Sequence, residues 1–160
     1  ILHASRKNRI ISLEPGGKRR VIEGGYTGRI EKVDQTFLQT VLSEKYLPVI
    51  APIALGTDYE PLNIDGDRAA AQIAGALKAD ALVLLTDVEH VKINSQAILR
   101  WTADQAKQSL PNIGSGMNTK VQAAIEALSQ GVRRAVIAPA QNNSPYSKAL
   151  TGEHGTVISQ

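Results

Sequence analysis

A polar turn, a helix of small residues and an apolar strand follow one another in residues 62–91. Asn63, Asp65 and Asp67 lie in the turn, where the start of a helix leaves four backbone N–H groups unpaired and partly positive. Alanine and glycine dominate residues 69–76, and such small side chains let a helix pack closely on a sheet. The pattern predicts a helix whose start can hold an anion, or at which one aspartate is simply the N-cap.

The strand of this stretch, residues 81–85, is apolar at every position, as expected of a central strand in a parallel sheet. It is followed by Thr86 and Asp87. Ligands of open α/β sheets bind at the carboxyl ends of the strands. An ordinary exit from a strand explains the same two residues, but the complete order of features fits one crossover unit that ends at a ligand site.

The rest of the chain alternates between short apolar strands and amphipathic helices. From residue 29 onward, this alternation predicts a three-layer α/β/α fold with a mostly parallel sheet. Before it, strands within residues 1–13 and 18–23 flank the turn Pro15-Gly16-Gly17 and predict an antiparallel hairpin. The other expected strands are 29–33, 47–53, 97–101, 134–139 and 156–159, the expected helices are 35–44, 103–109, 118–129 and 145–152, and residues 92–96 are expected to be a loop.

Composition narrows the class of protein. The chain has 160 residues, of which 42% are hydrophobic, and it contains no cysteine. It therefore cannot be a disulfide scaffold or hold a thiolate metal site. Its three histidines have no metal-ligand spacing, so no protein-bound metal is expected. No apolar run is long enough to span a membrane, and a cytoplasmic protein is expected.

Positive charge is concentrated at the start of the chain. Residues 1–32 contain eight lysines or arginines and three glutamates, in a chain whose formal net charge is +3. A basic face steers acidic partners toward it. It equally suits a solvated edge hairpin, whose charged side chains prevent aggregation. Nucleic acid is the weaker interpretation, because no aromatic stacking residues are interleaved with the charge.

Two glycine-rich segments outside residues 62–91 are also informative. Residues 24–28, Gly-Gly-Tyr-Thr-Gly, indicate backbone with positive φ or the close approach of a ligand, although a wide turn would also explain them. Residues 114–120 lead into a helix but lack the Gly-Lys-Ser/Thr order of a phosphate loop, since Val121 follows Lys120. Lys120 falls in the first turn of that helix, where the dipole disfavours a cation. It is either exposed or faces a bound anion.

The motifs LPVIAPIALG, LNIDGDRAAAQIAGALKADALVLLTDV, IGSGMNTKVQAAIEAL, GVRRAVIAP and GTVI resemble the amino acid kinase family over essentially the whole chain. Within it the chain is similar to the acetylglutamate kinase branch. The stretch EGGYTGRIEKVD resembles kinases that phosphorylate glutamate or 2-aminoadipate carried on the small acidic protein LysW, in arginine and lysine biosynthesis. The resemblance implies a carboxylate kinase using ATP and Mg²⁺. An acetylglutamate kinase acting on free N-acetylglutamate and a non-catalytic nucleotide-binding module are the alternatives.

The same resemblance implies roles for individual residues. Asn63, with Gly25 and Tyr26, would bind the amino-acid acceptor. Asp67 would organise the catalytic lysines, and Lys120 would stabilise the transferring or leaving phosphates. The nucleotide is expected at Thr86, Asp87, Val88, Gly116 and Met117.

The resemblance also implies an organisation for the chain. Residues 1–79 would be the remainder of an amino-acid- and carrier-binding lobe, and residues 80–160 the nucleotide-binding lobe. LysW would dock on residues 1–32, no nucleic acid or membrane is expected as a partner, and homo-oligomers are expected. The family's N-terminal part with its Lys-Gly-Gly motif is absent from these 160 residues, so the chain alone is expected to be inactive. His90 stands where the family usually has glycine, and it is expected to point to solvent.

Overall fold

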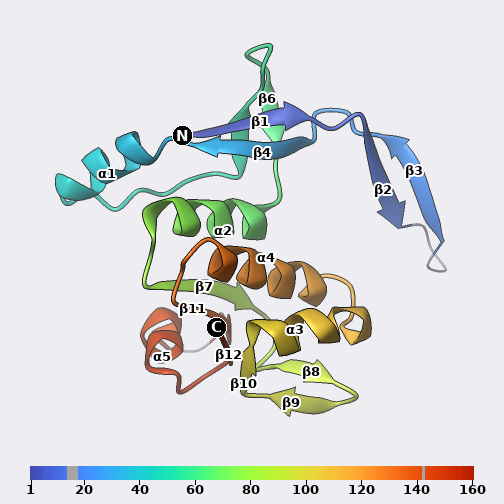
Figure 1. Ribbon diagram of the computed structural model, residues 1–160, viewed down its shortest axis with the longest axis vertical. Coiled ribbons are helices and arrows are strands. Elements are labelled where there is room, and N and C mark those ends of the chain that lie inside the picture. Colours follow the sequence, from blue (N-terminus) through green and yellow to red (C-terminus); the bar gives the residue numbers. More distant parts are fainter. Residues whose placement is uncertain (14–17, 142) are drawn as a thin grey trace. The chain divides into compact units, whose positions relative to one another are not determined.

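A computed structural model describes residues 1–13, 18–141 and 143–160 (Figure 1). The chain divides into two compact units, Ile1–Ala69 and Ala70–Gln160, and the division falls within one helix. The predicted turn Pro15-Gly16-Gly17 lies outside the described residues. None of the helices in the described part of the chain is long and apolar enough to cross a membrane.

The elements follow one another in the order labelled in Figure 1. The strands are β1 (Leu2–Arg6), β2 (Arg9–Leu13), β3 (Arg19–Glu23), β4 (Gly28–Val33), β5 (Ile53–Leu55), β6 (Pro61–Asn63), β7 (Ala81–Thr86), β8 (Val91–Ile93), β9 (Gln96–Ile98), β10 (Arg100–Thr102), β11 (Arg134–Pro139) and β12 (Thr156–Ser159). The helices are α1 (Gln35–Ser43), α2 (Gly66–Leu77), α3 (Ala103–Ser109), α4 (Met117–Ser129) and α5 (Pro145–Thr151), with a short 3₁₀ helix η1 (Leu110–Asn112) after α3.

The first unit is built on a four-stranded sheet in the order β4-β1-β5-β6. β1 pairs antiparallel with β4 and β5 antiparallel with β6, whereas β1 and β5 meet in parallel at His3 and Leu55. The predicted hairpin is confirmed as β2 paired antiparallel with β3, and β1 is a separate strand before it. The core of this unit includes Leu2, Ala4, Leu38, Ala54, Leu62, Ile64 and Ala69.

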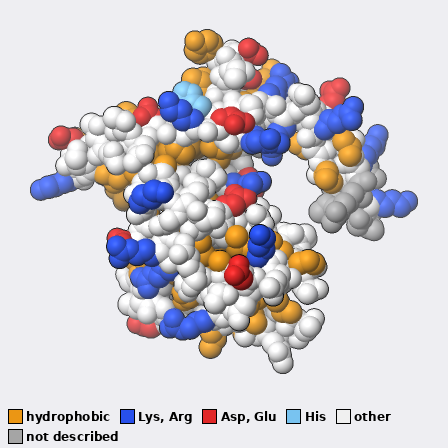
Figure 2. Space-filling view, in the orientation of Figure 1, with side chains coloured by type: hydrophobic (Ala, Val, Ile, Leu, Met, Phe, Trp, Pro, Cys, Tyr) orange, Lys and Arg blue, Asp and Glu red, His pale blue; other side chains and the backbone are white. Residues whose placement is uncertain are grey.

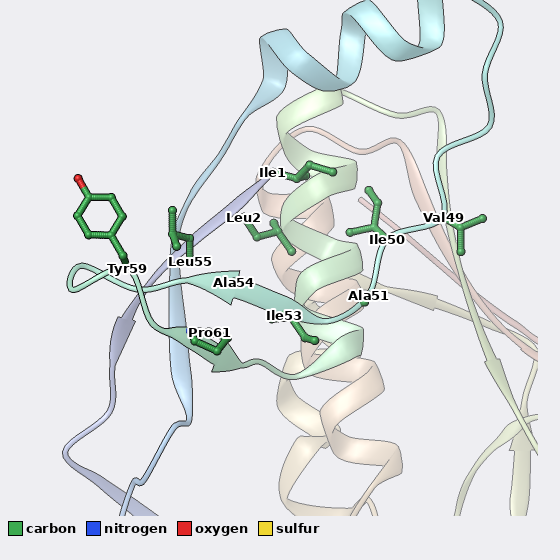
Figure 3. Close-up of a pocket in the computed structure, with 10 residues that line it drawn as sticks. All are labelled: Ile1, Leu2, Val49, Ile50, Ala51, Ile53, Ala54, Leu55, Tyr59 and Pro61. Carbon is green, nitrogen blue, oxygen red and sulfur yellow. The ribbon is translucent and has the colours of Figure 1, made fainter.

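The buried strand predicted over residues 47–53 is wrong. Strand β5 begins only at Ile53, and Leu47 and Val49 are 87% and 95% exposed. Within the described residues no strand pairs with residues 47–51. Leu47, Val49 and Ala51 are exposed, and Pro48 and Ile50 are half-buried. Figure 3 shows the open apolar groove at this surface, whose lining includes Ile1, Leu2, Val49, Ile50, Leu55 and Tyr59.

The second unit is a three-layer structure around a sheet in the order β10-β12-β11-β7. β11 pairs in parallel with β7 and antiparallel with β12, and β12 pairs in parallel with β10. Ala135 and Ile137 of β11 belong to the core that includes α4. Val136 and Ala138 point to the other face and pack with Ala149 of α5. Helices therefore cover both faces of the sheet, which confirms the predicted α/β/α fold.

Two predictions in this unit need correction. β7 was expected to be central, but it lies at the end of the described sheet. Leu82 and Leu84 are buried, and their neighbours along the strand are less buried. Residues 92–96 were expected to be a loop, but they form most of the hairpin β8–β9. Its turn residues Asn94 and Ser95 have φ of +48° and +67°, a conformation that asparagine adopts readily in two-residue hairpin turns.

The predicted helix starts are confirmed where capping side chains mark them. Asp34 caps α1 by accepting a hydrogen bond from the backbone N–H of Phe37 at 3.0 Å. Thr102 and Gln105 form the expected capping box of α3. Of the apolar side chains on α1, Leu38 is buried, whereas Phe37 and Leu42 are 49% and 43% exposed.

Burial predicts which apolar residues stabilise the first unit. Leu62 is fully buried, so Leu62→Ala should lower the free energy of unfolding by about 2–5 kcal/mol. The matched control, Val49→Ala, should change it by less than about 0.5 kcal/mol, because Val49 is exposed. Urea unfolding of the 160-residue chain measures both values. A loss at Val49 as large as that at Leu62 would contradict this description of the surface.

Candidate functional site

The glycine turn at residues 24–28 has a shape that requires glycine twice. Gly25 has a φ of +53°, which favours glycine. A Cβ atom on Gly24 would overlap the carbonyl oxygen of Lys7. The backbone N–H of Thr27 donates to the carbonyl of Gly24 at 2.9 Å, and that of Lys7 donates to the carbonyl of Thr27 at 2.8 Å. Positive φ at Gly25 and the close approach of the Lys7 backbone to Gly24 therefore explain these two glycines inside one hydrogen-bonded turn, and the expected approach of a ligand stays a prediction.

This turn is bonded directly to the polar turn before α2. The backbone N–H of Asn63 donates to the carbonyl oxygen of Tyr26 at 2.7 Å, and Thr27 forms a parallel bridge with Asn63. Asn63 is the last residue of β6, and its side chain is exposed. The structure thus brings together Gly25, Tyr26 and Asn63, the three residues that the resemblance assigns to the acceptor.

Arg6 is a residue of this site that the sequence did not reveal. Its Nε donates to the carbonyl oxygen of Gly25 at 2.5 Å, and its guanidinium carbon lies 4.7 Å from the centroid of the Tyr26 ring. An exposed cation–π contact of this kind contributes about 0.5–1 kcal/mol. Arg6 therefore supports both the backbone and the aromatic side chain of the turn.

The two aspartates at the start of α2 occupy different positions. The Oδ1 of Asp65 accepts a hydrogen bond from the backbone N–H of Arg68 at 2.9 Å, so Asp65 is the capping side chain. Asp67 lies in the first turn of α2, where the helix dipole stabilises an anion, and it is half-buried. The sequence left open which aspartate caps the helix. The structure assigns that role to Asp65, and the catalytic role of Asp67 stays a prediction.

The predicted nucleotide residues gather at one edge of the second sheet. Thr86 ends β7 and lies opposite Pro139, the last residue of β11, in a parallel register. α4 ends shortly before β11 begins and packs on the sheet, so it runs antiparallel to β11 and starts at the edge where β7 and β11 end (Figure 1). That edge carries Thr86, Asp87, Val88, Gly116, Met117 and Lys120.

The start of α4 can accommodate phosphate. Gly116, its N-cap, has a φ of +86°, and a Cβ there would meet nothing within 4 Å in the described structure. The helix start makes no side-chain capping bond among the described residues, and the backbone N–H of Asn118 donates to the carbonyl oxygen of Gly114 at 3.1 Å. The neighbouring N–H groups and half-buried Lys120 of the same turn can face an anion. The side chain of Met117 packs against the hydrophobic core, which leaves its backbone for contact with a nucleotide.

In the described part of the chain, no group of three or more His, Asp or Glu side chains could hold a metal ion. Mg²⁺ commonly binds through one or two carboxylates together with substrate phosphates and water. Asp87 is an exposed carboxylate at this edge of the second sheet. The residues present therefore fit a Mg²⁺ ion that is held mainly by a nucleotide.

The expectation that His90 points to solvent is wrong. Its Nδ1 lies 3.0 Å from the carbonyl oxygen of Gly155, and the side chain is half-buried. The loop after β7 lies against the turn before β12, so the ring meets a carbonyl rather than water. The two residues are 65 positions apart, and the contact exists only in the folded chain.

Two known proteins with similar sequences are longer than this chain. The chain is 45% identical over 158 residues to a protein of Cenarchaeum symbiosum, covering 99% of this chain and 59% of that protein. It is 42% identical over 156 residues to the LysW-aminoadipate/LysW-glutamate kinase of Sulfurisphaera tokodaii, covering 97% of this chain and 59% of that enzyme. The chain thus spans about 59% of the length of these relatives.

A similar fold is present in solved structures. The crystal structure of N-acetylglutamate synthase from Neisseria gonorrhoeae, complexed with coenzyme A and L-arginine, superposes with a TM-score of 0.79 at 23% identity. The match covers 97% of this chain and 37% of that chain, and it shows a shared fold. Residues 3–139 match the amino acid kinase family as a whole. This match, the sequence relatives and the α/β/α fold all agree, and the chain belongs to the amino acid kinase family.

Proposed function

We propose that this protein transfers the γ-phosphoryl group of ATP to the side-chain carboxylate of glutamate or 2-aminoadipate carried on LysW. The observation that carries the proposal is the backbone hydrogen bond from Asn63 to Tyr26. It joins the glycine turn and the end of β6, the two segments of the first unit that would bind the acceptor. The name of the Sulfurisphaera tokodaii relative supports the same carrier-bound acceptor. The product would be an acyl phosphate for arginine and lysine biosynthesis, and we propose a cytoplasmic location for this reaction.

The chemistry suits a site without a general base. A carboxylate is ionised at neutral pH, so one of its oxygens can attack the γ-phosphorus directly. A new O–P bond forms while the bond from that phosphorus to the β–γ bridging oxygen breaks, and ADP leaves with the electron pair. The main obstacle is repulsion between anions, which positive side chains and helix N-termini lower.

The residues of this chain would divide that work. Lys120 and the start of α4 would neutralise charge on the phosphates, and Asp67 would orient the cationic groups around them. Asn63 and the Gly25–Tyr26 turn would hold the acceptor, and Thr86–Val88 the ribose and base. Mg²⁺ bound to ATP supplies further neutralisation of phosphate charge.

The hairpin β2–β3 supports the proposal of a protein-borne acceptor. Arg9, Lys18 and Arg20 are exposed on it, and Figure 2 shows lysine and arginine side chains over this hairpin. Ile11 and Val21 are cross-strand partners and are 64% and 61% exposed. Protein interfaces combine an apolar centre with a polar rim, and opposite charge accelerates docking. An acidic carrier such as LysW fits this surface.

The first test is the choice of acceptor. Because the chain spans 59% of its relatives' length, turnover is measured on a protein extended to that length. We expect Mg²⁺-ATP to yield ADP and a hydroxylamine-trapped acyl phosphate only with glutamate or aminoadipate on LysW. Lys120→Ala should lower kcat by about 100-fold or more, because it removes charge stabilisation of the transition state. Lys107→Ala, an exposed lysine on α3, is the control and should not change kcat.

Each other outcome has a definite meaning. Turnover of free N-acetylglutamate would make the protein an acetylglutamate kinase, and the hairpin β2–β3 would then have no role in docking a carrier protein. ATP binding without turnover on any acceptor would indicate a non-catalytic nucleotide-binding module. Equal loss of activity in Lys107→Ala and Lys120→Ala would contradict the assignment of Lys120.

The hairpin charges give a second test. The triple variant R9Q/K18Q/R20Q should lower kcat/KM for carrier-bound acceptors by about 10-fold or more at low salt, because electrostatic steering is lost. The control K45Q/K92Q/K107Q changes the net charge equally at exposed lysines elsewhere and should have little effect. Measurements from low to high salt should show the difference shrinking as the charges are screened. Identical salt dependence in the two variants would rule out docking on this hairpin.

The contacts of Arg6 give a third test. Arg6→Met removes the bond to Gly25 and the contact with the Tyr26 ring, so the KM for the acceptor should rise about 5- to 30-fold. The KM for ATP should stay unchanged. Arg133→Met removes an exposed arginine whose ion pair with Asp80 is solvent-accessible, and it should change neither value. A rise in the KM for ATP alone would contradict the placement of the acceptor at this turn.

A further inference from the structure

The loop that follows β7 is anchored at both of its ends. At its start, the carbonyl of Thr86 accepts a hydrogen bond from the backbone N–H of Ala140 at 2.8 Å, which continues the pairing of β7 with β11. At its other end, the buried N–H of Val91 donates to the Oγ1 of Thr156 at 2.9 Å. Residues 87–89 between these anchors are exposed. The shape of the exposed part therefore depends on the two anchors.

The second anchor is built around a buried hydroxyl. Thr156 is fully buried, and its hydroxyl donates to the carbonyl of Ile98 while it accepts from Val91. A buried hydroxyl with both bonds made is held in one orientation, because leaving either group unpaired would cost free energy. Thr156 thus fixes the position of Val91 in the fold.

The preceding residue, Gly155, fixes the place of the carbonyl that His90 contacts. Gly155 has a φ of +91°, and a Cβ there would overlap the carbonyl oxygen of Ile137 in β11. The turn before β12 therefore lies directly against the central strand, where only glycine fits. Its carbonyl oxygen is 3.0 Å from the Nδ1 of His90, within hydrogen-bond distance. His90 connects the exposed part of the loop to a rigid point of the fold.

A neighbouring contact contributes less. The Nδ1 of His154 lies 3.8 Å from the Oε2 of Glu89, a contact that is an ion pair only when the imidazole is protonated, and the two side chains are 34% and 63% exposed. Solvent-exposed pairs of this kind add little stability. The half-buried contact between His90 and Gly155 is the stronger candidate for fixing the loop.

We infer that His90 is a positioning residue for the nucleotide. Through its bond to Gly155, it holds the backbone of residues 86–88 in the arrangement that receives the ribose and base of ATP. The inference rests on the proposed function, because it takes the end of β7 as the nucleotide site. Since the phosphates are assigned to Lys120 and the start of α4, His90 should affect the nucleoside part of the ligand and leave the phosphate part unaffected.

The test compares two ligands and a matched pair of substitutions. His90→Leu removes the donor, whereas His90→Asn can place an amide N–H near the position of Nδ1. We expect His90→Leu to raise the Kd for ATP by about 3- to 10-fold, the effect of one hydrogen bond, and His90→Asn to restore most of the affinity. The Kd for inorganic tripolyphosphate should stay unchanged in both. Isothermal titration calorimetry measures both ligands on the protein extended to the length of its relatives, as in the turnover test.

Further controls distinguish a failure of this inference from a failure of the proposed function on which it rests. His154→Leu removes the neighbouring histidine and should leave the Kd for ATP unchanged. Equal Kd values for ATP in the unsubstituted chain and in His90→Leu overturn the role of His90 and leave the proposed function intact. Equal weakening of ATP and tripolyphosphate indicates general destabilisation and also overturns it. Absence of ATP binding by the unsubstituted chain overturns the nucleotide site of the proposed function, and the inference with it.

Discussion

The burial of strand β11 on both faces is the constraint on which the second unit depends. All of its residues after Arg134 are buried, and they alternate between the core beneath α4 and the core beneath α5. Such a strand must be apolar throughout, because a polar side chain on either face would need a buried partner. β7, β12 and α4 are all positioned by packing or pairing with it.

The same strand sets the geometry of the sheet edge that is proposed to bind the nucleotide. Its parallel pairing with β7 places Thr86 beside Pro139, and its packing under α4 brings the start of that helix to the same edge. Gly155 lies against Ile137 and provides the carbonyl that His90 meets. The polar residues at this edge come from separate segments of the chain, and a single buried strand brings them together. A rigid scaffold of this kind is what a phosphoryl transfer site needs, because its catalysis consists mostly of positioning.

The first unit holds its candidate site in a different way. Its sheet is small and much apolar surface is exposed, yet the glycine turn and Asn63 are joined by a backbone hydrogen bond. Because backbone atoms make this bond, the side chains of Tyr26 and Asn63 remain available to a ligand. The acceptor specificity would then lie in side chains such as Tyr26 and Arg6, while the backbone keeps the turn in place.

The sequence by itself determined the features that depend on neighbouring residues: the caps Asp34 and Thr102, most helices, the first hairpin, the α/β/α class and the residues that resemble the family. The caps and helices involve atoms a few positions apart, and the hairpin and the fold class follow from the order of strands, turns and helices along the chain, so the sequence reveals them. Only the tertiary structure decided that residues 47–51 lie at the surface, that Arg6 meets Gly25 and that His90 meets Gly155. The last two contacts join residues 19 and 65 positions apart, and burial depends on which elements are present to cover a segment. Neither can be read from local periodicity, because both arise only when distant segments pack together.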